Sequence, residues 1–152
     1  MEKAKVSITK FENPERTILT AVRLIGGVAD LDRPGFQVII KPGIFDPSRP
    51  PYTDIRVAKA AASLFHKTKD ISFAESDNPM RTGMEALRRT GYSQITRVGL
   101  LDLSSSLSQL KRGRLKLLKG QKFSKFLLNT DILLNLPVMK GDPRTGAISI
   151  GM

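Results

Sequence analysis

Short runs of apolar residues recur along the chain and predict strands. VSIT, residues 6–9, alternates apolar and polar side chains, as a half-buried strand does. FQVIIK (36–41), ISFAE (71–75), VGLLDLS (98–104) and DILLNL (131–136) are apolar stretches bounded by turn residues. The sequence therefore predicts strands beginning near the first residue of each stretch, and the tail GAISIG alternates again.

Between these runs, apolar residues recur with helical spacing. Asn13 followed by Pro14 is a helix start, and the apolar face after it ends at a pair of glycines. Thr53 is positioned to cap a second helix. A third helix is expected near Met80 to Arg89, and a short fourth one in KFSKFLLNT, residues 122–130.

The order of these elements predicts the fold class. Strands separated by helices of this length favour βαβ units, in which the strands are parallel and the helices pack on the sheet. We therefore expect an α/β fold with a mainly parallel sheet and helices on both faces. The length of 152 residues suits a single domain, residues 1–152.

Polar residues at the ends of the predicted strands suggest a binding edge. Ligands of open α/β sheets bind at the carboxyl ends of the strands. We expect Lys41 and Lys140 to bind an anionic small molecule there, because a lysine is a compact point charge. The secondary candidates, which also follow predicted strands, are Glu75, Ser76, Asp102 and Asn135.

The stretch DILLNLPVMKGDPRTG, residues 131–146, carries the more distant of the two lysines. Pro137 ends the predicted strand, so the chain beyond it is expected to bring Lys140 to the edge where Lys41 lies. We predict that both lysines are open to solvent and face one shared anion.

The charge distribution supports a second class of function. The net charge is +11, and residues 77–152 carry most of it. Basic residues without any acid concentrate in one segment, which contains Lys111, Arg112, Arg114, Lys116, Lys119, Lys122 and Lys125. The turn and extended basic segment at 107–118 could attract nucleic acid phosphates, although weakly and in a salt-dependent way. The absence of tryptophan and of any recognisable nucleic-acid-binding motif argues against this alternative.

Composition excludes several kinds of chemistry. The chain has no cysteine, so it holds no disulfide, thiolate nucleophile or cysteine-ligated iron–sulfur cluster. It has one histidine, His66, which excludes multi-histidine zinc sites, and we predict no metal site. The N-terminus is charged and the apolar stretches are short, so we expect no membrane contact and a cytoplasmic location. The cofactor and the reaction are left open.

Several motifs together are similar to a known family. They are ENPERTILTAVRLIGG near the start, PGFQVIIKP, FAES, TGYSQI before VGLLDLS, and DILLNLPVMK followed by TG. In this order and spacing the chain resembles domain of unknown function 362 (DUF362), whose members are often described as iron–sulfur-associated. The resemblance runs along nearly the whole chain and implies a redox-associated α/β domain with functional lysines at the strand ends.

The resemblance also implies a longer family domain. Family members characteristically continue past the position of Met152, so this chain is expected to be an N-terminal portion, a degenerate member or a gene fragment. An inactive truncated member is accordingly a third alternative. The last strand would then need a partner chain or a C-terminal extension beside it.

Overall fold

The computed structural model describes residues 4–109, 120–141 and 148–149. The helices are α1 (Pro14–Leu24), α2 (Ile55–Ala62), α3 (Gly83–Arg89) and α4 (Lys125–Asn129), with a 3₁₀ turn, η1, at Tyr92–Gln94. The strands are β1 (Gln37–Pro42), β2 (Asp70–Glu75), β3 (Gly99–Asp102), β4 (Leu107–Gln109), β5 (Lys122–Ser124), β6 (Ile132–Leu136), β7 (Lys140–Gly141) and β8 (Ile148–Ser149).

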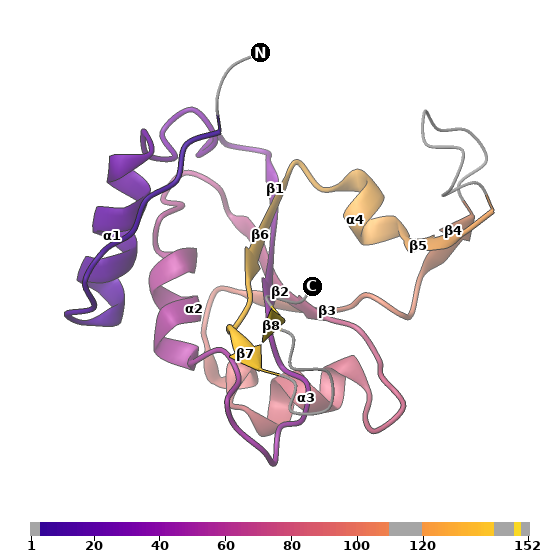
Figure 1. Ribbon diagram of the computed structural model, residues 1–152. Helices are drawn as coiled ribbons and strands as arrows, with labels where there is room; N and C mark the ends of the chain where they lie inside the picture. The colour runs from indigo at the N-terminus through magenta and orange to yellow at the C-terminus, as the bar shows by residue number, and fades with distance from the viewer. Residues whose placement is uncertain (1–3, 110–119, 142–147, 150–152) are drawn as a thin grey trace.

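Four strands form one sheet in the order β3-β2-β1-β6, and all neighbouring strands are parallel. Two antiparallel pairs, β4 with β5 and β7 with β8, form separate two-stranded sheets. Figure 1 shows α1 and α2 on one side of the sheet and α4 on the other. The predicted α/β class with a mainly parallel sheet is confirmed.

Successive side chains of the central strands point to opposite faces of the sheet and contribute to two hydrophobic cores. Val38 and Ile40 of β1 pack with Phe73 of β2 and with apolar residues of α2 and α3 in the larger core. Ile39 points to the opposite face, where Phe126 of α4 lies against a smaller cluster. The strands are apolar on both faces because a parallel sheet is covered on both.

The helix starts follow local capping chemistry. The Asn13 side chain accepts a hydrogen bond from the Arg16 N–H at 2.9 Å and begins α1, as predicted. The expected cap of α2 was wrong by one residue, because Asp54 occupies that position. The Thr53 hydroxyl instead accepts from the Gly43 N–H at 2.8 Å and donates to the Leu136 carbonyl, which ties the loop after β1 to β6.

The strand predicted at residues 6–9 does not form. This segment has no regular secondary structure, and Val6 and Ile8 are 83% and 92% exposed. The Ser7 hydroxyl donates to the Ala21 carbonyl of α1 at 2.8 Å, so the segment follows a helix instead of another strand. Alternation was an insufficient signal because a strand also needs a neighbour for its backbone hydrogen bonds.

Asp32 links the segment before β1 to the loop after α2 through hydrogen bonds. Its buried carboxylate accepts hydrogen bonds from the backbone N–H groups of His66, Lys67 and Thr68 at 3.0–3.1 Å. Burial by itself would raise the pKa of Asp32, but the hydrogen bonds from Thr68, His66 and Lys67 outweigh it, and the pKa is lowered.

This lowered pKa leads to a pH-dependent prediction for Asp32→Asn. A carboxyl with a depressed folded pKa adds stability above its unfolded pKa of about 3.9 and loses that contribution as the pH falls through the folded value. The variant should therefore be less stable than the wild type at pH 7, and the difference should shrink below pH 4. Urea unfolding of both proteins across this range measures it, and a difference independent of pH would contradict the assignment.

None of the helices among the described residues is long and apolar enough to cross a membrane.

Candidate functional site

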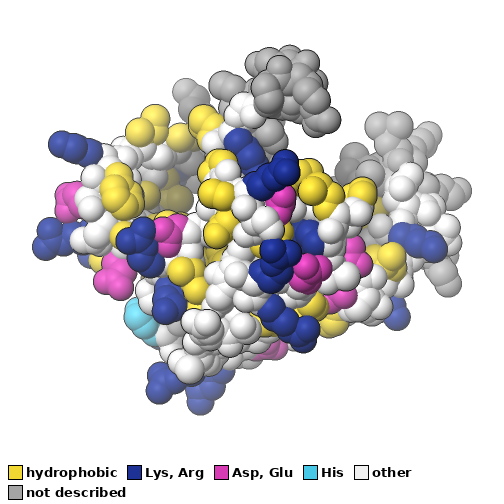
Figure 2. Space-filling view, turned by 90° about the horizontal axis from the view of Figure 1, so that it is seen from below, with side chains coloured by type: hydrophobic (Ala, Val, Ile, Leu, Met, Phe, Trp, Pro, Cys, Tyr) yellow, Lys and Arg dark blue, Asp and Glu magenta, His cyan; other side chains and the backbone are white. Residues whose placement is uncertain are grey.

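A pocket of about 220 Å³ lies at the edge where β1 and β2 end, which is the face shown in Figure 2. Three segments form it: the end of β1 with its following loop, the end of β2 with the loop leading to α3, and the segment from β6 to β7. We call it the carboxyl-edge pocket. Its lining residues are Lys41, Gly43, Ile44, Phe45, Glu75, Ser76, Asn78, Arg81, Val138 and Lys140.

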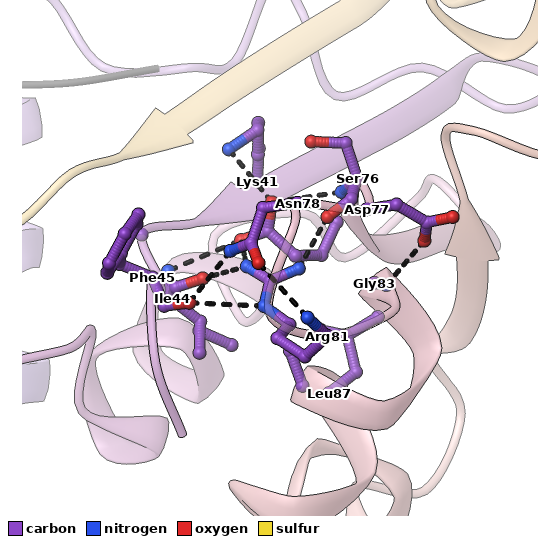
Figure 3. A network of polar contacts seen from close by, with 12 residues as sticks. Lys41, Ile44, Phe45, Ser76, Asp77, Asn78, Arg81, Gly83 and Leu87 are labelled. Atoms are coloured by element: carbon purple, nitrogen blue, oxygen red, sulfur yellow. Dashed lines mark hydrogen bonds and ion pairs between the residues drawn. The ribbon is translucent and has the colours of Figure 1, made fainter. Parts of the chain in front are cut away.

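Glu75, the last residue of β2, contacts four of the residues labelled in Figure 3 through its carboxylate. Its Oε1 lies 3.2 Å from Lys41 Nζ and accepts from the Ser76 N–H at 2.9 Å. Its Oε2 accepts from the Ile44 N–H at 3.3 Å and lies 3.7 Å from a terminal nitrogen of Arg81. The carboxylate is 4% exposed, so these contacts replace the water it has lost.

Arg81 joins the loops after β1 and β2. Its guanidinium donates to the backbone carbonyls of Ile44, Phe45 and Ser76, and its side chain is 5% exposed. Five donors in a fixed planar fork suit a residue that must satisfy several carbonyls at once. Arg81 therefore fixes the pocket wall while it adds a positive charge.

The loop before α3 is held by short polar contacts. The Asp77 side chain accepts from the Gly83 N–H at 2.8 Å, and the Asn78 side-chain amide donates to the Phe45 carbonyl at 2.9 Å. The Thr82 hydroxyl accepts from the Glu85 N–H at 3.1 Å and caps the helix. Together they set the position from which Arg81 reaches the pocket.

Lys140 enters the pocket from β7. Its Nζ lies 5.7 Å from the centre of the Phe45 ring, a cation–π distance. No carboxylate among the described residues lies within ion-pair distance of this ammonium group. The lining thus has three cations, Lys41, Arg81 and Lys140, and one carboxylate, that of Glu75.

Comparison with known proteins assigns the chain to a family. The model of the family described as domain of unknown function (DUF362) matches residues 38–152. The chain belongs to the DUF362 family. Neither the comparison with curated proteins nor that with solved structures found a match.

The DUF362 match begins in β1 and includes every residue that lines the carboxyl-edge pocket. The motif ENPERTILTAVRLIGG, residues 12–27, precedes the match, so the family model does not support that part of the resemblance. The iron–sulfur association and the truncation of the DUF362 chain stay predictions, because the match concerns the sequence of this segment alone.

Four of the predicted site residues line one pocket, and two do not. Lys41, Lys140, Glu75 and Ser76 all line the carboxyl-edge pocket. Asp102 pairs with Glu75 in the strand register, but its carboxylate accepts from the Ser104 N–H at 2.8 Å and closes the turn after β3.

Asn135 lines a different pocket of about 450 Å³, beside α2. Its Oδ1 is buried and has no hydrogen-bond partner among the described residues. Asn135 therefore does not line the carboxyl-edge pocket, although it pairs with Lys41 in the sheet.

The solvent exposure of Lys41 differs from the prediction. We predicted that both lysines are open to solvent, but the Lys41 side chain is 15% exposed and its ammonium group pairs with Glu75. Both residues lie in the last two positions of adjacent parallel strands, so their side chains can meet at the edge of the sheet. The sequence analysis also missed Arg81. It placed this residue in a predicted helix near Met80 to Arg89, whereas Arg81 lies in the loop before α3 and its side chain is 5% exposed.

The basic segment proposed for nucleic acid lies mostly outside the described residues. Lys122 in β5 and Lys125 at the start of α4 are described, and both are exposed. The other five basic residues of the segment fall at positions 111–119, outside the described ranges. In the part of the chain that the structure describes, no three His, Asp or Glu side chains are grouped closely enough to hold a metal ion.

Proposed function

We propose that this DUF362 domain binds a small anionic ligand, a carboxylate or a phosphate, in the carboxyl-edge pocket. The observation that carries the proposal is the charge imbalance of the lining, where Lys41, Arg81 and Lys140 face the single carboxylate of Glu75. Glu75 already forms ion pairs with Lys41 and Arg81. The ammonium group of Lys140 has no such partner among the described residues and can therefore bind a ligand. A bound anion would offset the mutual repulsion of the three cations.

The pocket volume limits the size of this ligand. A water molecule occupies about 30 Å³ of the liquid, so 220 Å³ has room for roughly seven waters. That space suits inorganic phosphate, a phosphate group or a short dicarboxylate. A whole nucleotide would have to extend beyond the pocket into solvent.

The alternatives to this proposal lead to different expectations. A nucleic-acid-associated role would depend on the basic segment, of which Lys122 and Lys125 are the described residues. A redox role implied by the family resemblance would make the bound anion a substrate, and the lining residues would then orient it. An inactive family member would keep the fold and bind neither phosphate nor a carboxylate.

Lys140→Ala tests the proposal directly. Titration calorimetry with phosphate and, separately, with succinate should give binding about tenfold weaker than in the wild type, since one charge-assisted contact contributes roughly 1.5–3 kcal/mol when fully desolvated and this lysine is partly exposed. Comparing the two ligands distinguishes a phosphate site from a carboxylate site. Thermal unfolding should change little, because Lys140 has no ion-pair partner among the described residues.

Lys122→Ala is the matched control. It removes the same charge from another short strand at an exposed position outside the carboxyl-edge pocket. Equal losses in the two variants would show that net charge alone governs binding, and the pocket assignment would have to be abandoned in favour of the basic surface. The absence of binding in the wild type would favour an inactive family member.

A further inference from the structure

A further hollow, which at about 710 Å³ is larger than the carboxyl-edge pocket, lies at the opposite end of the sheet. It is bounded by the end of α2, by the loop that follows α2, by the first residues of β2 and by residues 95–98 before β3. We call it the amino-edge groove. No residue of the carboxyl-edge pocket lines it, so the two sites are separate.

The charged residues that line the amino-edge groove are all basic. Lys59 comes from α2, Lys69 from the loop before β2 and Arg97 from the segment before β3. Neither an aspartate nor a glutamate is part of the lining, and none of the three cations forms an ion pair with a described residue. The groove therefore presents an uncompensated positive field to solvent.

The floor of the amino-edge groove is apolar. Phe65 and Ile71 belong to the larger core, and Ile95 and Val98 are half-buried residues packed against it. An inorganic anion would leave this apolar surface uncovered. A ligand that carries both an anionic group and an apolar body would satisfy the cations at the rim and cover the floor.

Arg97 has an unusual backbone conformation. Its φ is +66°, and it is the only residue other than glycine with positive φ among the described residues. A side chain with a Cβ is disfavoured in this left-handed region, and such residues concentrate at binding sites. Glycine would relieve the conformation at no steric cost, so retaining arginine there provides a cation at a position where folding alone favours glycine.

Hydrogen bonds to Asp32 fix the loop between α2 and β2, which forms one wall of the groove. Asp32, which is not part of the lining, accepts hydrogen bonds from the backbone N–H groups of His66, Lys67 and Thr68. These bonds balance the charge of the carboxylate and fix the loop between α2 and β2. The groove is therefore formed before any ligand arrives, which lowers the entropic cost of binding.

We propose that the amino-edge groove is a binding site for an organic anion with an aromatic or short aliphatic body, held by Lys59, Lys69 and Arg97 over the apolar floor. This site is independent of the anion pocket at the other end of the sheet.

The test uses 8-anilino-1-naphthalenesulfonate, an anion with an aromatic body, and N-phenyl-1-naphthylamine, its uncharged analogue. Fluorescence titration should show that the sulfonate binds at least about fivefold more tightly than the amine, and that added salt weakens only the sulfonate. Amide chemical shifts in ¹⁵N NMR spectra should change mainly at residues 59–71 and 95–98. This mapping distinguishes the groove from other exposed apolar surface.

Two variants remove the cations separately. Lys69→Gln and Arg97→Gly should each weaken sulfonate binding about fivefold, as expected for partly exposed charge contacts. Arg97→Gly should also raise the melting temperature by about 3 °C, because glycine relieves the left-handed conformation. Lys10→Gln, at an exposed position outside the groove, is the matched control and should change affinity less than twofold.

Four results would overturn the proposal. Equal affinity for the sulfonate and the amine, or unchanged sulfonate binding in both cation variants, would reduce the groove to an apolar surface only. Chemical shift changes confined to another region would place the site elsewhere. A more stable Arg97→Gly protein with wild-type affinity would show that the Arg97 conformation has no part in binding. None of these results depends on whether Lys140 binds an anion.

Discussion

Replacing Glu75 with glutamine is expected to destabilise the protein by about 3 kcal/mol at neutral pH and low ionic strength. The carboxylate is 4% exposed and lies between Lys41 and Arg81, whose side chains are 15% and 5% exposed. Glutamine keeps the shape of the side chain but leaves two nearly buried cations without a counter-charge. Removing one partner of a buried ionic group typically costs 3–5 kcal/mol for this reason.

Glu85→Gln provides the matched control for this loss. Glu85 pairs with Arg89 at 3.1 Å on the surface of α3, where both side chains are about half exposed. Such a pair contributes at most about 0.5 kcal/mol, so urea unfolding should separate the two variants clearly. If both substitutions cost the same, the interior network contributes no more than a surface ion pair.

The Glu75 variant also tests the anion pocket by an independent route. Without its carboxylate, the pocket keeps three cations, so phosphate should bind more tightly and should restore part of the lost stability. Full destabilisation without any rescue by phosphate or succinate would mean that Glu75 is structural and that the anion does not bind beside it.

The sequence predicted the edge of the sheet at which these residues meet. Strand polarity and the apolar runs were enough, because parallel strands bring their carboxyl ends to one edge and Lys41, Glu75 and Lys140 follow such runs. The ion pair between Lys41 and Glu75 was not predictable. It depends on β1 and β2 being neighbours in the sheet, which follows from packing of the whole chain.

Residues that act through distant contacts were missed for the same reason. Arg81 reaches carbonyls more than thirty positions earlier in the chain, and Asp32 binds backbone groups at 66–68. Local sequence placed Arg81 in a predicted helix and gave no sign that either charge is buried, so neither could be distinguished from an ordinary exposed charge. The opposite error occurred at residues 6–9, where a good local pattern had no neighbouring strand to pair with.

At Gly83 the start of α3 lies close to the backbone at the end of β2. A Cβ at this position would lie 2.4 Å from the Glu75 carbonyl oxygen and 2.7 Å from its carbonyl carbon. Both atoms are backbone, so the helix or the strand end would have to move. No other amino acid fits this contact without a shift of α3 relative to the carboxyl-edge pocket.

We therefore expect Gly83→Ala to destabilise the protein by about 2 kcal/mol. Overpacking of this kind costs about 1–3 kcal/mol or more, and the better helix propensity of alanine offsets up to about 1 kcal/mol of it. The melting temperature should fall by about 6 °C for a chain of this length. Gly141→Ala is the control, since a Cβ there meets no atom of a described residue within 4 Å and should shift the melting temperature by less than about 2 °C. Displacement of α3 would also displace Arg81, so Gly83→Ala should weaken phosphate binding as well. A variant that melts and binds phosphate like the wild type would contradict the close contact between α3 and β2.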